Sequence, residues 1–399
     1  MRDIRRRSIL AGALAVPLTA GLPASSATAT THRTAENSPA ENRPSTHHPS
    51  GHRPTAPDAD ALRAALAGLP DADATAALVR VGGTGGRWHG SSGVHDLESG
   101  RPADPHARFR AGSTTKVVTA AAVLRLAAEG RIGLDTPVRA HLPDLLGARF
   151  GKVTVRHLLD HTSGIPAGDG LGTTFEELYA HRFDTLSPQR VAASAGAKRP
   201  EFRPGRQQHY LNINYTFLGL LIERVTGRSY ASEVSRLVLA PAGMRDTYFP
   251  DTDPRILGPH NRGYQAVTGA DGTTEFLDVT EWNQADRFAA GDMISTTADL
   301  ERLLTGLFRG RIVPRSHLRE VFSVPTRIPG ASYSAGGLQR FESDGQVYWV
   351  KSGGRYGYNS AIAATSDLGR TLVYSVNSTD AKSEDANPVV GRIITAALR

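Results

Sequence analysis

The pattern of apolar and polar positions becomes regular at Asp58, where the folded part of the chain is expected to begin. A first helix of about ten residues is predicted because apolar positions recur at helical spacing behind an acidic start. These positions are Leu62, Leu66 and Leu69. Strand-like runs follow at 76–81 and 88–94, on either side of the glycine-rich turn 82–86, and predict an antiparallel hairpin. No Gly-Lys-Ser or Gly-Lys-Thr follows these glycines, which argues against a phosphate-binding loop.

Strand-like runs return at the other end of the chain. They lie at 346–351, 360–365 and 370–376, and 389–398 has the pattern of a closing helix. Between the two ends, helical periodicity predicts helices at 115–129, 155–160, 175–179, 215–225 and 230–239. Strands at both ends with helices between them predict one sheet assembled from distant segments.

The first 29 residues have the order of an export signal. A basic start at 5–7 precedes an apolar stretch at 11–22 and a small-residue cleavage site at 27–29. The arginines followed by Ser-Ile-Leu at 8–10 predict the twin-arginine type of signal, with an ordinary secretory signal as the alternative. No segment reaches ~18 uninterrupted apolar residues, so no membrane anchor is expected. We therefore expect a protein that is secreted or held in the cell envelope.

Residues 30–57 are rich in Thr, Ser, Pro, His and Asn and have almost no large apolar side chain. Burial cannot offset the entropy lost on ordering such a segment, so we predict a disordered linker. Its histidines, His47, His48 and His52, fit plain linker positions better than a metal site because nothing fixes a coordination geometry. The folded domain is then 58–399.

Composition narrows the classes of function. The 399 residues are 39% hydrophobic and 21% charged, as in a soluble globular protein. Cysteine is absent, which excludes disulfides, thiol nucleophiles and thiolate metal sites. Of the net charge of +7, residues 1–57 contribute +4, from seven arginines and three acids. The remaining +3 is too small to neutralise many phosphates, so no nucleic-acid partner is expected.

Ser113 and Lys116 carry the first candidate chemistry. They lie at the start of the predicted helix 115–129, and a spacing of three places both side chains on one helix face. A serine hydroxyl becomes a nucleophile when a base takes its proton, and desolvation can lower the pKa of a lysine enough for this task. The alternative is an N-capping serine beside a solvated lysine. However, the chain has only five lysines, and only Lys116 has a serine three residues before it.

Two further motifs follow in the chain. Tyr210 and Asn212 form its only Tyr-x-Asn, just before the helix predicted at 215–225. A tyrosine hydroxyl beside a lysine can pass protons to a leaving group, and an asparagine amide can hold both lysine and substrate. The run 351–354, Lys-Ser-Gly-Gly, ends a predicted strand and offers a cation, a hydroxyl and glycines that let a substrate lie close.

The order Ser-x-x-Lys, Tyr-x-Asn, Lys-Ser-Gly resembles that of the penicillin-recognising serine hydrolases: D-alanyl-D-alanine carboxypeptidases, class C β-lactamases and their esterase relatives. Stretches at 155–164 and 289–300 look like landmarks of the same family, and the resemblance covers 58–399. The chain is most similar to the secreted D-alanyl-D-alanine carboxypeptidases of actinomycetes.

The resemblance implies an α/β (α+β) fold of the β-lactamase or DD-peptidase type. In it, an antiparallel sheet is flanked by the terminal helices and carries an inserted, mostly helical region. The sheet part would come from about 58–138 and 295–399, and the helical part from about 139–294.

The resemblance also implies a role for each motif residue. Ser113 would attack a carbonyl, and Lys116 and Tyr210 would move the proton. Asn212 would position Lys116 and the substrate amide, and Lys351 would complete the polar network around Tyr210.

Substrate binding would fall largely to the third motif. The backbone N–H groups of Ser113 and Gly354 would hold the developing oxyanion, about 3 Å away. Carboxypeptidases of the family often carry histidine where Lys351 stands and threonine where Gly354 stands. Without that hydroxyl, a terminal carboxylate would bind to Lys351, Ser352 and Arg340. The substrate-binding residues expected are Ser352, Gly353, Gly354 and Arg340.

The leading hypothesis is a D-alanyl-D-alanine carboxypeptidase that forms an acyl-enzyme on Ser113 and is trapped by β-lactams. A class C-like β-lactamase, an esterase or a D-amino-acid amidase on the same scaffold is the alternative, and a non-catalytic penicillin-binding module is a third possibility. No cofactor or metal is predicted, and we expect a monomer. Gly-x-Ser-x-Gly and His-Glu-x-x-His do not occur, so His161 is interpreted as a structural loop residue.

Overall fold

A computed structural model describes residues 55–343 and 345–398 of the chain. The predicted signal peptide, 1–29, and the predicted linker up to residue 54 lie outside the described residues. At the end of that linker, Thr55 is bound, because Arg370 Nη2 donates to its carbonyl oxygen at 2.9 Å and to its hydroxyl at 3.1 Å.

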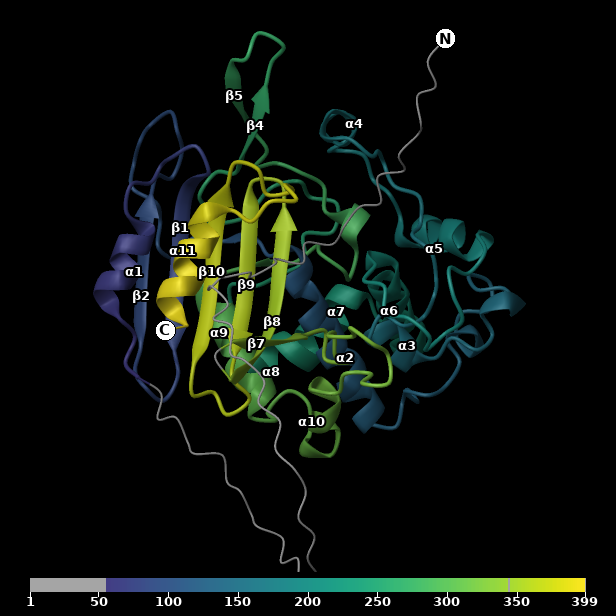
Figure 1. The fold of residues 1–399 in the computed structure, drawn as a ribbon. Coiled ribbons are helices and arrows are strands. Elements are labelled where there is room, and N and C mark those ends of the chain that lie inside the picture. Colours follow the sequence, from purple (N-terminus) through teal and green to yellow (C-terminus); the bar gives the residue numbers. More distant parts are fainter. Residues whose placement is uncertain (1–54, 344, 399) are drawn as a thin grey trace, which may run out of the picture. The chain divides into compact units, whose positions relative to one another are not determined.

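Strands from both ends of the chain form a six-stranded antiparallel sheet in the order β2-β1-β10-β9-β8-β7 (Figure 1). The strands are β1 (Ala74–Gly82), β2 (Trp88–Gly93), β7 (Gln339–Ser343), β8 (Gln346–Arg355), β9 (Tyr358–Ala364) and β10 (Thr371–Ser378). The predicted hairpin and the three C-terminal runs are confirmed, and β7 was not predicted. The first and last strands are neighbours, with Val79 paired to Tyr374, so the sheet is assembled from distant segments as expected.

Helices cover both faces of the sheet and fill the middle of the chain. They are α1 (Ala59–Leu66), α2 (Thr115–Ala128), α3 (Val155–Leu159), α4 (Phe175–Ala180), α5 (Pro188–Ala197), α6 (Asn212–Thr226), α7 (Tyr230–Val234), α8 (Ala240–Ala242), α9 (Thr297–Phe308), α10 (Arg315–Val321) and α11 (Pro388–Ala397). All seven predicted helices are present, whereas α5, α8, α9 and α10 were not predicted. Within the described part of the chain, none of these helices is long and apolar enough to cross a membrane.

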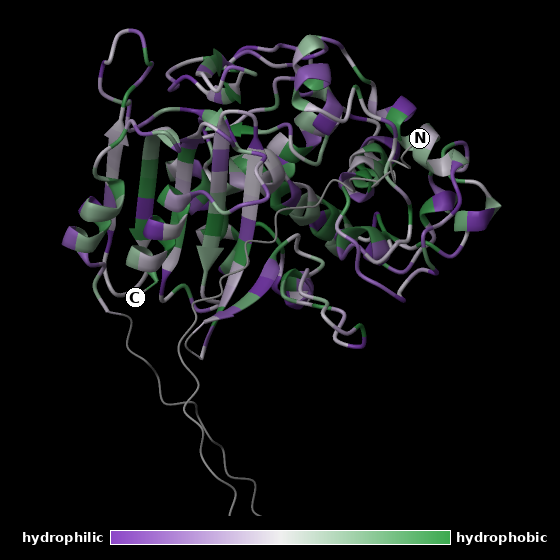
Figure 2. Ribbon diagram, turned by 45° about the horizontal axis from the view of Figure 1, so that its top comes forward, coloured by the Kyte–Doolittle hydropathy of each residue, from purple (hydrophilic) through white to green (hydrophobic). Residues whose placement is uncertain are grey.

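Each face of the sheet has its own apolar core because side chains alternate along the strands. Leu62 of α1 and Ile393 of α11 pack against the face that carries Val376. The opposite face carries Ile362 and Val373 and packs against the central helices. In Figure 2, apolar residues, in green, run along the strands, and hydrophilic residues, in purple, gather in the outer helices and loops.

Helix α2 lies at the centre of the helical part. Its first ten residues, 115–124, are all buried, and it contacts α6, α7 and α10. A helix that is buried on every side is fixed in position by its neighbours. The chain that leads into it is therefore fixed as well, and this chain contains Ser113.

Short strands hold the chain just ahead of α2. β3 (Phe109–Arg110) pairs with β6 (Ile294–Ser295), and β4 (Tyr264–Thr268) pairs with β5 (Thr274–Asp278). Arg110 is 2% exposed, and its guanidinium donates to three backbone carbonyls. These acceptors are Val279 O at 2.9 Å, Pro254 O at 2.9 Å and Trp282 O at 3.2 Å.

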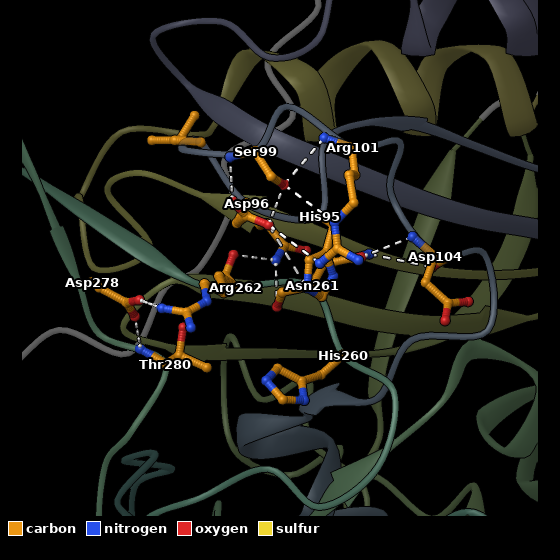
Figure 3. A network of polar contacts seen from close by, with 12 residues as sticks. His95, Asp96, Ser99, Arg101, Asp104, His260, Asn261, Arg262, Asp278 and Thr280 are labelled. Carbon is orange, nitrogen blue, oxygen red and sulfur yellow. Dashed lines mark hydrogen bonds and ion pairs between the residues drawn. The ribbon is translucent and has the colours of Figure 1, made fainter.

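A polar network, shown in Figure 3, joins the loop after β2 to the segment before β4. Asn261 binds Asp104 twice, accepting from its N–H at 2.9 Å and donating to its carbonyl at 3.2 Å. Arg262 donates its N–H to His95 O at 2.8 Å and its guanidinium to Asp278 at 2.6 Å. These contacts fix the approach of the chain to β3.

We predict that Arg110→Met destabilises the fold by about 3–5 kcal/mol, because two buried carbonyls and one partly buried carbonyl lose their donor. The matched control is Arg63→Met, in which an exposed arginine is lost and the change stays within about 0.5 kcal/mol. Urea unfolding of both variants measures the difference. A loss below about 1 kcal/mol for Arg110→Met would contradict this account.

Candidate active site

Ser113 lies in the short 3₁₀ helix Gly112–Thr114, which runs directly into α2. Its hydroxyl is not used as a helix cap, because the N-cap residue of α2 is Thr114 and makes no side-chain cap bond. The Ser113 side chain is half-buried, and Lys116 Nζ lies 3.0 Å from its oxygen. The predicted placement of both side chains on one helix face is confirmed.

The Lys116 amine is held by three oxygen atoms. Besides Ser113 Oγ, Nζ is 2.7 Å from Asn212 Oδ1 and 2.6 Å from the Ala290 carbonyl. A neutral amine has two N–H groups and one lone pair, whereas the amide and carbonyl oxygens can only accept. The two N–H groups are therefore directed to Asn212 and Ala290, and the lone pair is left for the Ser113 hydroxyl proton.

Burial and neighbouring cations favour this neutral amine. Lys116 is 0% exposed, and desolvation lowers its pKa well below 10.5. The positive charges of Lys351, Arg287 and Lys382 lower the pKa of Lys116 further, and Asp292 raises it in part. In its neutral form, an amine in this arrangement can accept the proton of the Ser113 hydroxyl.

Tyr210 lies between two lysines. Nζ of Lys116 is 5.0 Å from the centre of its ring, and Nζ of Lys351 is 4.9 Å from it. Burial raises the pKa of Tyr210 above its usual range, although the nearby Ser113 hydroxyl lowers it in part. The Tyr210 hydroxyl has no hydrogen bond of normal geometry among the described residues. It therefore stays protonated and can give its proton to a leaving group.

Asn212 is the first residue of α6, so this helix begins three residues earlier than predicted. The helix extends to Asn212 because Ile213, Asn214 and the residues after them are buried against the core, which the apolar period from 215 onward did not reveal. The consequence is that Asn212 projects from a fixed helix end toward Lys116.

Strand β8 forms the other wall and continues through the glycines to Arg355, beyond the predicted end at 351. Gly353 pairs with Ser360 on β9 and lies directly against the backbone from Ala111 to Ser113. A Cβ at Gly353 would lie 2.1 Å from Ala111 O and 2.9 Å from Ser113 N. Gly112, at φ +52°, faces Gly354 in the same way, since its Cβ would lie 2.7 Å from Gly354 N. Only glycines allow this approach.

The edge of β8 beside Ser113 exposes backbone groups. The Ser352 carbonyl accepts from Lys351 Nζ at 2.7 Å, and the Gly354 carbonyl accepts from Lys382 Nζ at 2.6 Å. In an antiparallel strand the N–H and C=O of one residue point to the same side, so the Gly354 N–H also faces this edge. The Ser113 N–H lies at a helix start, where it has no intrahelical partner. The two groups fit the predicted oxyanion donors.

A family model described as Beta-lactamase matches residues 59–394. The chain belongs to the β-lactamase family. The resemblance to penicillin-recognising serine hydrolases is thereby confirmed, and so is the fold that it implied.

Solved structures of this β-lactamase fold include two D-specific enzymes. The D-stereospecific amidohydrolase of a Streptomyces species has a TM-score of 0.73 at 31% identity, over 86% of this chain and 98% of that chain. The D-amino acid amidase of Ochrobactrum anthropi SV3 has a TM-score of 0.71 at 23% identity, over 84% of this chain and 98% of that chain. The second likeness shows the fold alone.

Relatives that match by sequence include an esterase and a penicillin-binding protein. Esterase EstB of Burkholderia gladioli is 37% identical over 186 residues, which are 43% of this chain and 46% of that protein. Penicillin-binding protein 4* of Bacillus subtilis is 27% identical over 312 residues, which are 75% of this chain and 66% of that protein. The chain thus spans about half to two thirds of the length of these relatives.

Two predicted substrate-binding residues, Ser352 and Arg340, lie at different places in the structure. The Ser352 hydroxyl has no partner among the described residues and stays available at the edge of β8. Arg340, on β7, is exposed, and in the described part of the chain its guanidinium pairs with Glu342 at 2.9 Å and not with the other site residues. Lys382, which was not predicted, binds the Gly354 carbonyl instead. Its rarity as one of five lysines was the only sequence signal.

We predict that acylation of Ser113 rises with pH through the pKa of Lys116, because only the neutral amine can take the serine proton. This rise is complete well below pH 10.5. Lys116→Arg keeps a permanent cation and should slow acylation at least about 10³-fold. Measuring the acylation rate by a fluorescent penicillin from pH 5 to pH 10 tests both statements. A rise centred near pH 10.5 would show that Lys116 is an ordinary ammonium group.

Proposed function

We propose that the protein is an exported serine-type D-alanyl-D-alanine carboxypeptidase that forms an acyl-enzyme on Ser113. The geometry of the Lys116 amine is the observation that supports serine hydrolase chemistry. Its N–H groups are directed to Asn212 and Ala290, so its lone pair can accept the proton of the Ser113 hydroxyl. Ser113 attacks the carbonyl as Lys116 takes its proton, and Tyr210 passes a proton to the leaving amine. Water then cleaves the ester by the same groups in reverse.

The charge around Ser113 supports a substrate with a free carboxylate. Lys351 is 4% exposed and forms no ion pair among the described residues, and burial lowers its pKa to about 7. Lys382 is exposed, and it too has no carboxylate partner in the described part of the chain. Arg355 and Arg287 share a single acid, Asp286. The pKa of Lys382 is also lowered to about 7, so a bound anion that raises the pKa values of both lysines would charge them fully. Basic groups therefore exceed acids beside Gly354, which favours an anionic group on the substrate.

A D-amino-acid amidase is the second candidate, favoured by the 31% identity to the Streptomyces D-stereospecific amidohydrolase. The free amino group of such a substrate is largely protonated at neutral pH. Beside Lys351 and Lys382 this cation would be repelled, whereas the terminal carboxylate of a D-alanyl-D-alanine peptide would be attracted. The charge of the cleft thus supports the carboxypeptidase over the amidase.

We predict that a fluorescent penicillin labels the protein covalently and that Ser113→Ala abolishes the label. Intact-protein mass measurement should show the added mass on one serine only. The control is Ser316→Ala, which removes an exposed serine of α10 and should leave labelling unchanged. If the wild-type protein is not labelled, or if Ser113→Ala still is, the acyl-enzyme proposal is wrong.

We predict that Lys382→Met lowers kcat/KM about tenfold for N-acetyl-D-alanyl-D-alanine, which corresponds to about 1.4 kcal/mol of lost binding to its carboxylate. The same peptide with a C-terminal amide should be affected less than about twofold. Lys152→Met, which removes an exposed lysine outside the cleft, is the matched control. Equal losses for both peptides would remove the support for carboxylate binding and leave serine chemistry untouched.

A further inference from the structure

The loop 160–163 lies against the Tyr-x-Asn motif, and the proton transfers described above do not use it. His161 in this loop is 1% exposed and has a positive φ of 60°. Its carbonyl accepts from the N–H of His209 at 2.9 Å, and its Nδ1 accepts from the N–H of Leu211 at 3.4 Å. The residues on both sides of Tyr210 are therefore bound to this one histidine.

The ring of Tyr210 is also packed on His161. The two ring centres are 4.4 Å apart, with a tilt of 38°, and the ring of Tyr333 lies 4.9 Å from that of Tyr210. Gln208 holds Tyr333 in place, because its side chain binds both the N–H and the carbonyl of that residue. Tyr210 is thus enclosed by two aromatic rings, and no residue that the structure describes orients its hydroxyl through a hydrogen bond of normal geometry.

The hydrogen bonds of the His161 imidazole show which of its two nitrogens carries the proton. Asn214 Oδ1 is 2.6 Å from the Ser163 hydroxyl, so its amide Nδ2 is turned toward His161 Nδ1, 3.2 Å away. Nδ1 accepts hydrogen bonds and the ring proton is therefore assigned to Nε2. Burial lowers the pKa of His161 well below 6.5. His161 is thus a neutral support and takes up no proton at neutral pH.

The positive φ of His161 limits which residues can replace it. A non-glycine residue at φ 60° costs energy, and asparagine tolerates this region better than most residues. The turn is held by Asp160, whose carboxylate accepts from the N–H of Thr162 at 3.2 Å and from its hydroxyl at 2.6 Å. Only a side chain with an acceptor near the ring nitrogen can serve the N–H of Leu211 there.

We propose that His161 is the positioning residue of Tyr210: it fixes the tyrosine ring so that the hydroxyl faces Ser113 and can protonate the leaving group. This inference rests on the proposed acyl-enzyme function. In the step concerned, the C–N bond breaks as the Tyr210 proton moves to the leaving nitrogen. The phenolate regains a proton from Lys116, which had taken it from Ser113.

The test compares two substrates with the same acyl group, N-acetyl-D-alanyl-D-alanine and the p-nitrophenyl ester of N-acetyl-D-alanine. The amine must be protonated as it leaves, whereas p-nitrophenolate leaves without a proton. His161→Ala should lower kcat for the peptide about 100-fold and kcat for the ester less than about fivefold. Tyr210→Phe should show the same selective loss, because it removes the group that His161 positions.

His161→Asn provides the conservative variant, since it keeps an acceptor and tolerates the left-handed backbone but lacks the ring. Its peptide-to-ester ratio should fall about tenfold, between those of the wild type and His161→Ala. This variant also keeps the test open if His161→Ala does not fold, which thermal unfolding of each variant will show.

The outcomes separate this inference from the proposed function. If folded His161 variants keep the wild-type peptide-to-ester ratio, or if both substrates slow equally, His161 is only structural and the inference is wrong. If the wild type hydrolyses neither substrate, or if Ser113→Ala keeps activity, the proposed function itself fails.

Discussion

The removal of the Lys116 amine from water is the constraint on which the site depends. A buried ammonium group without a carboxylate partner is costly, so the group is stabilised as a neutral amine that needs two acceptors and one donor. Asn212 and Ala290 supply the acceptors and Ser113 supplies the donor. These groups come from the 3₁₀ helix before α2, from α6 and from the turn before β6. The helical region must therefore be packed before Lys116 can act as a base.

The second constraint is the close approach of the sheet to the start of α2. Gly353 and Gly112 leave no room for a side chain, and the sheet edge therefore presents its backbone directly beside the Ser113 N–H. Strand β8 is held in turn by β9 and, through β10, by the first strand of the domain. The two walls of the site are thus fixed by different parts of the fold, the helices behind Lys116 and the sheet behind Gly354.

Family membership alone does not identify the substrate of this chain. The D-stereospecific amidohydrolase, the esterase and the penicillin-binding protein among the relatives share a fold or a family with this chain, but their names describe different acyl substrates. In this chain, Ser113 and Lys116 are surrounded by an excess of positive charge. Lys382 and Lys351 have no carboxylate partner in the described part of the chain, and this excess of cations beside Gly354 supports a carboxylate-bearing substrate.

Local patterns predicted much of the fold, because alternation and helical periodicity are read from neighbouring residues. The β1–β2 hairpin, strands β8–β10, the terminal helices and α2 all follow from them. The helices α5, α8, α9 and α10 were missed, although the buried leucines of α9 recur at helical spacing behind its N-cap, Thr296. The early start of α6 was missed because tertiary burial decides it. Strand β8 was predicted too short, because its glycines are kept in the strand by pairing with β9 and by contact with Gly112.

The same division holds for the site. The sequence by itself determined the candidate nucleophile and its candidate base, because a serine three residues before a scarce lysine lies on one turn of helix. Tyr210, Asn212 and Lys351 were found through motif order, but their meeting at Lys116 required the packed structure. Only the tertiary structure decided that Arg340 lies away from the site, that Lys382 reaches Gly354 and that His161 holds Tyr210. Each of these depends on contacts between residues distant in the chain, which no local pattern records.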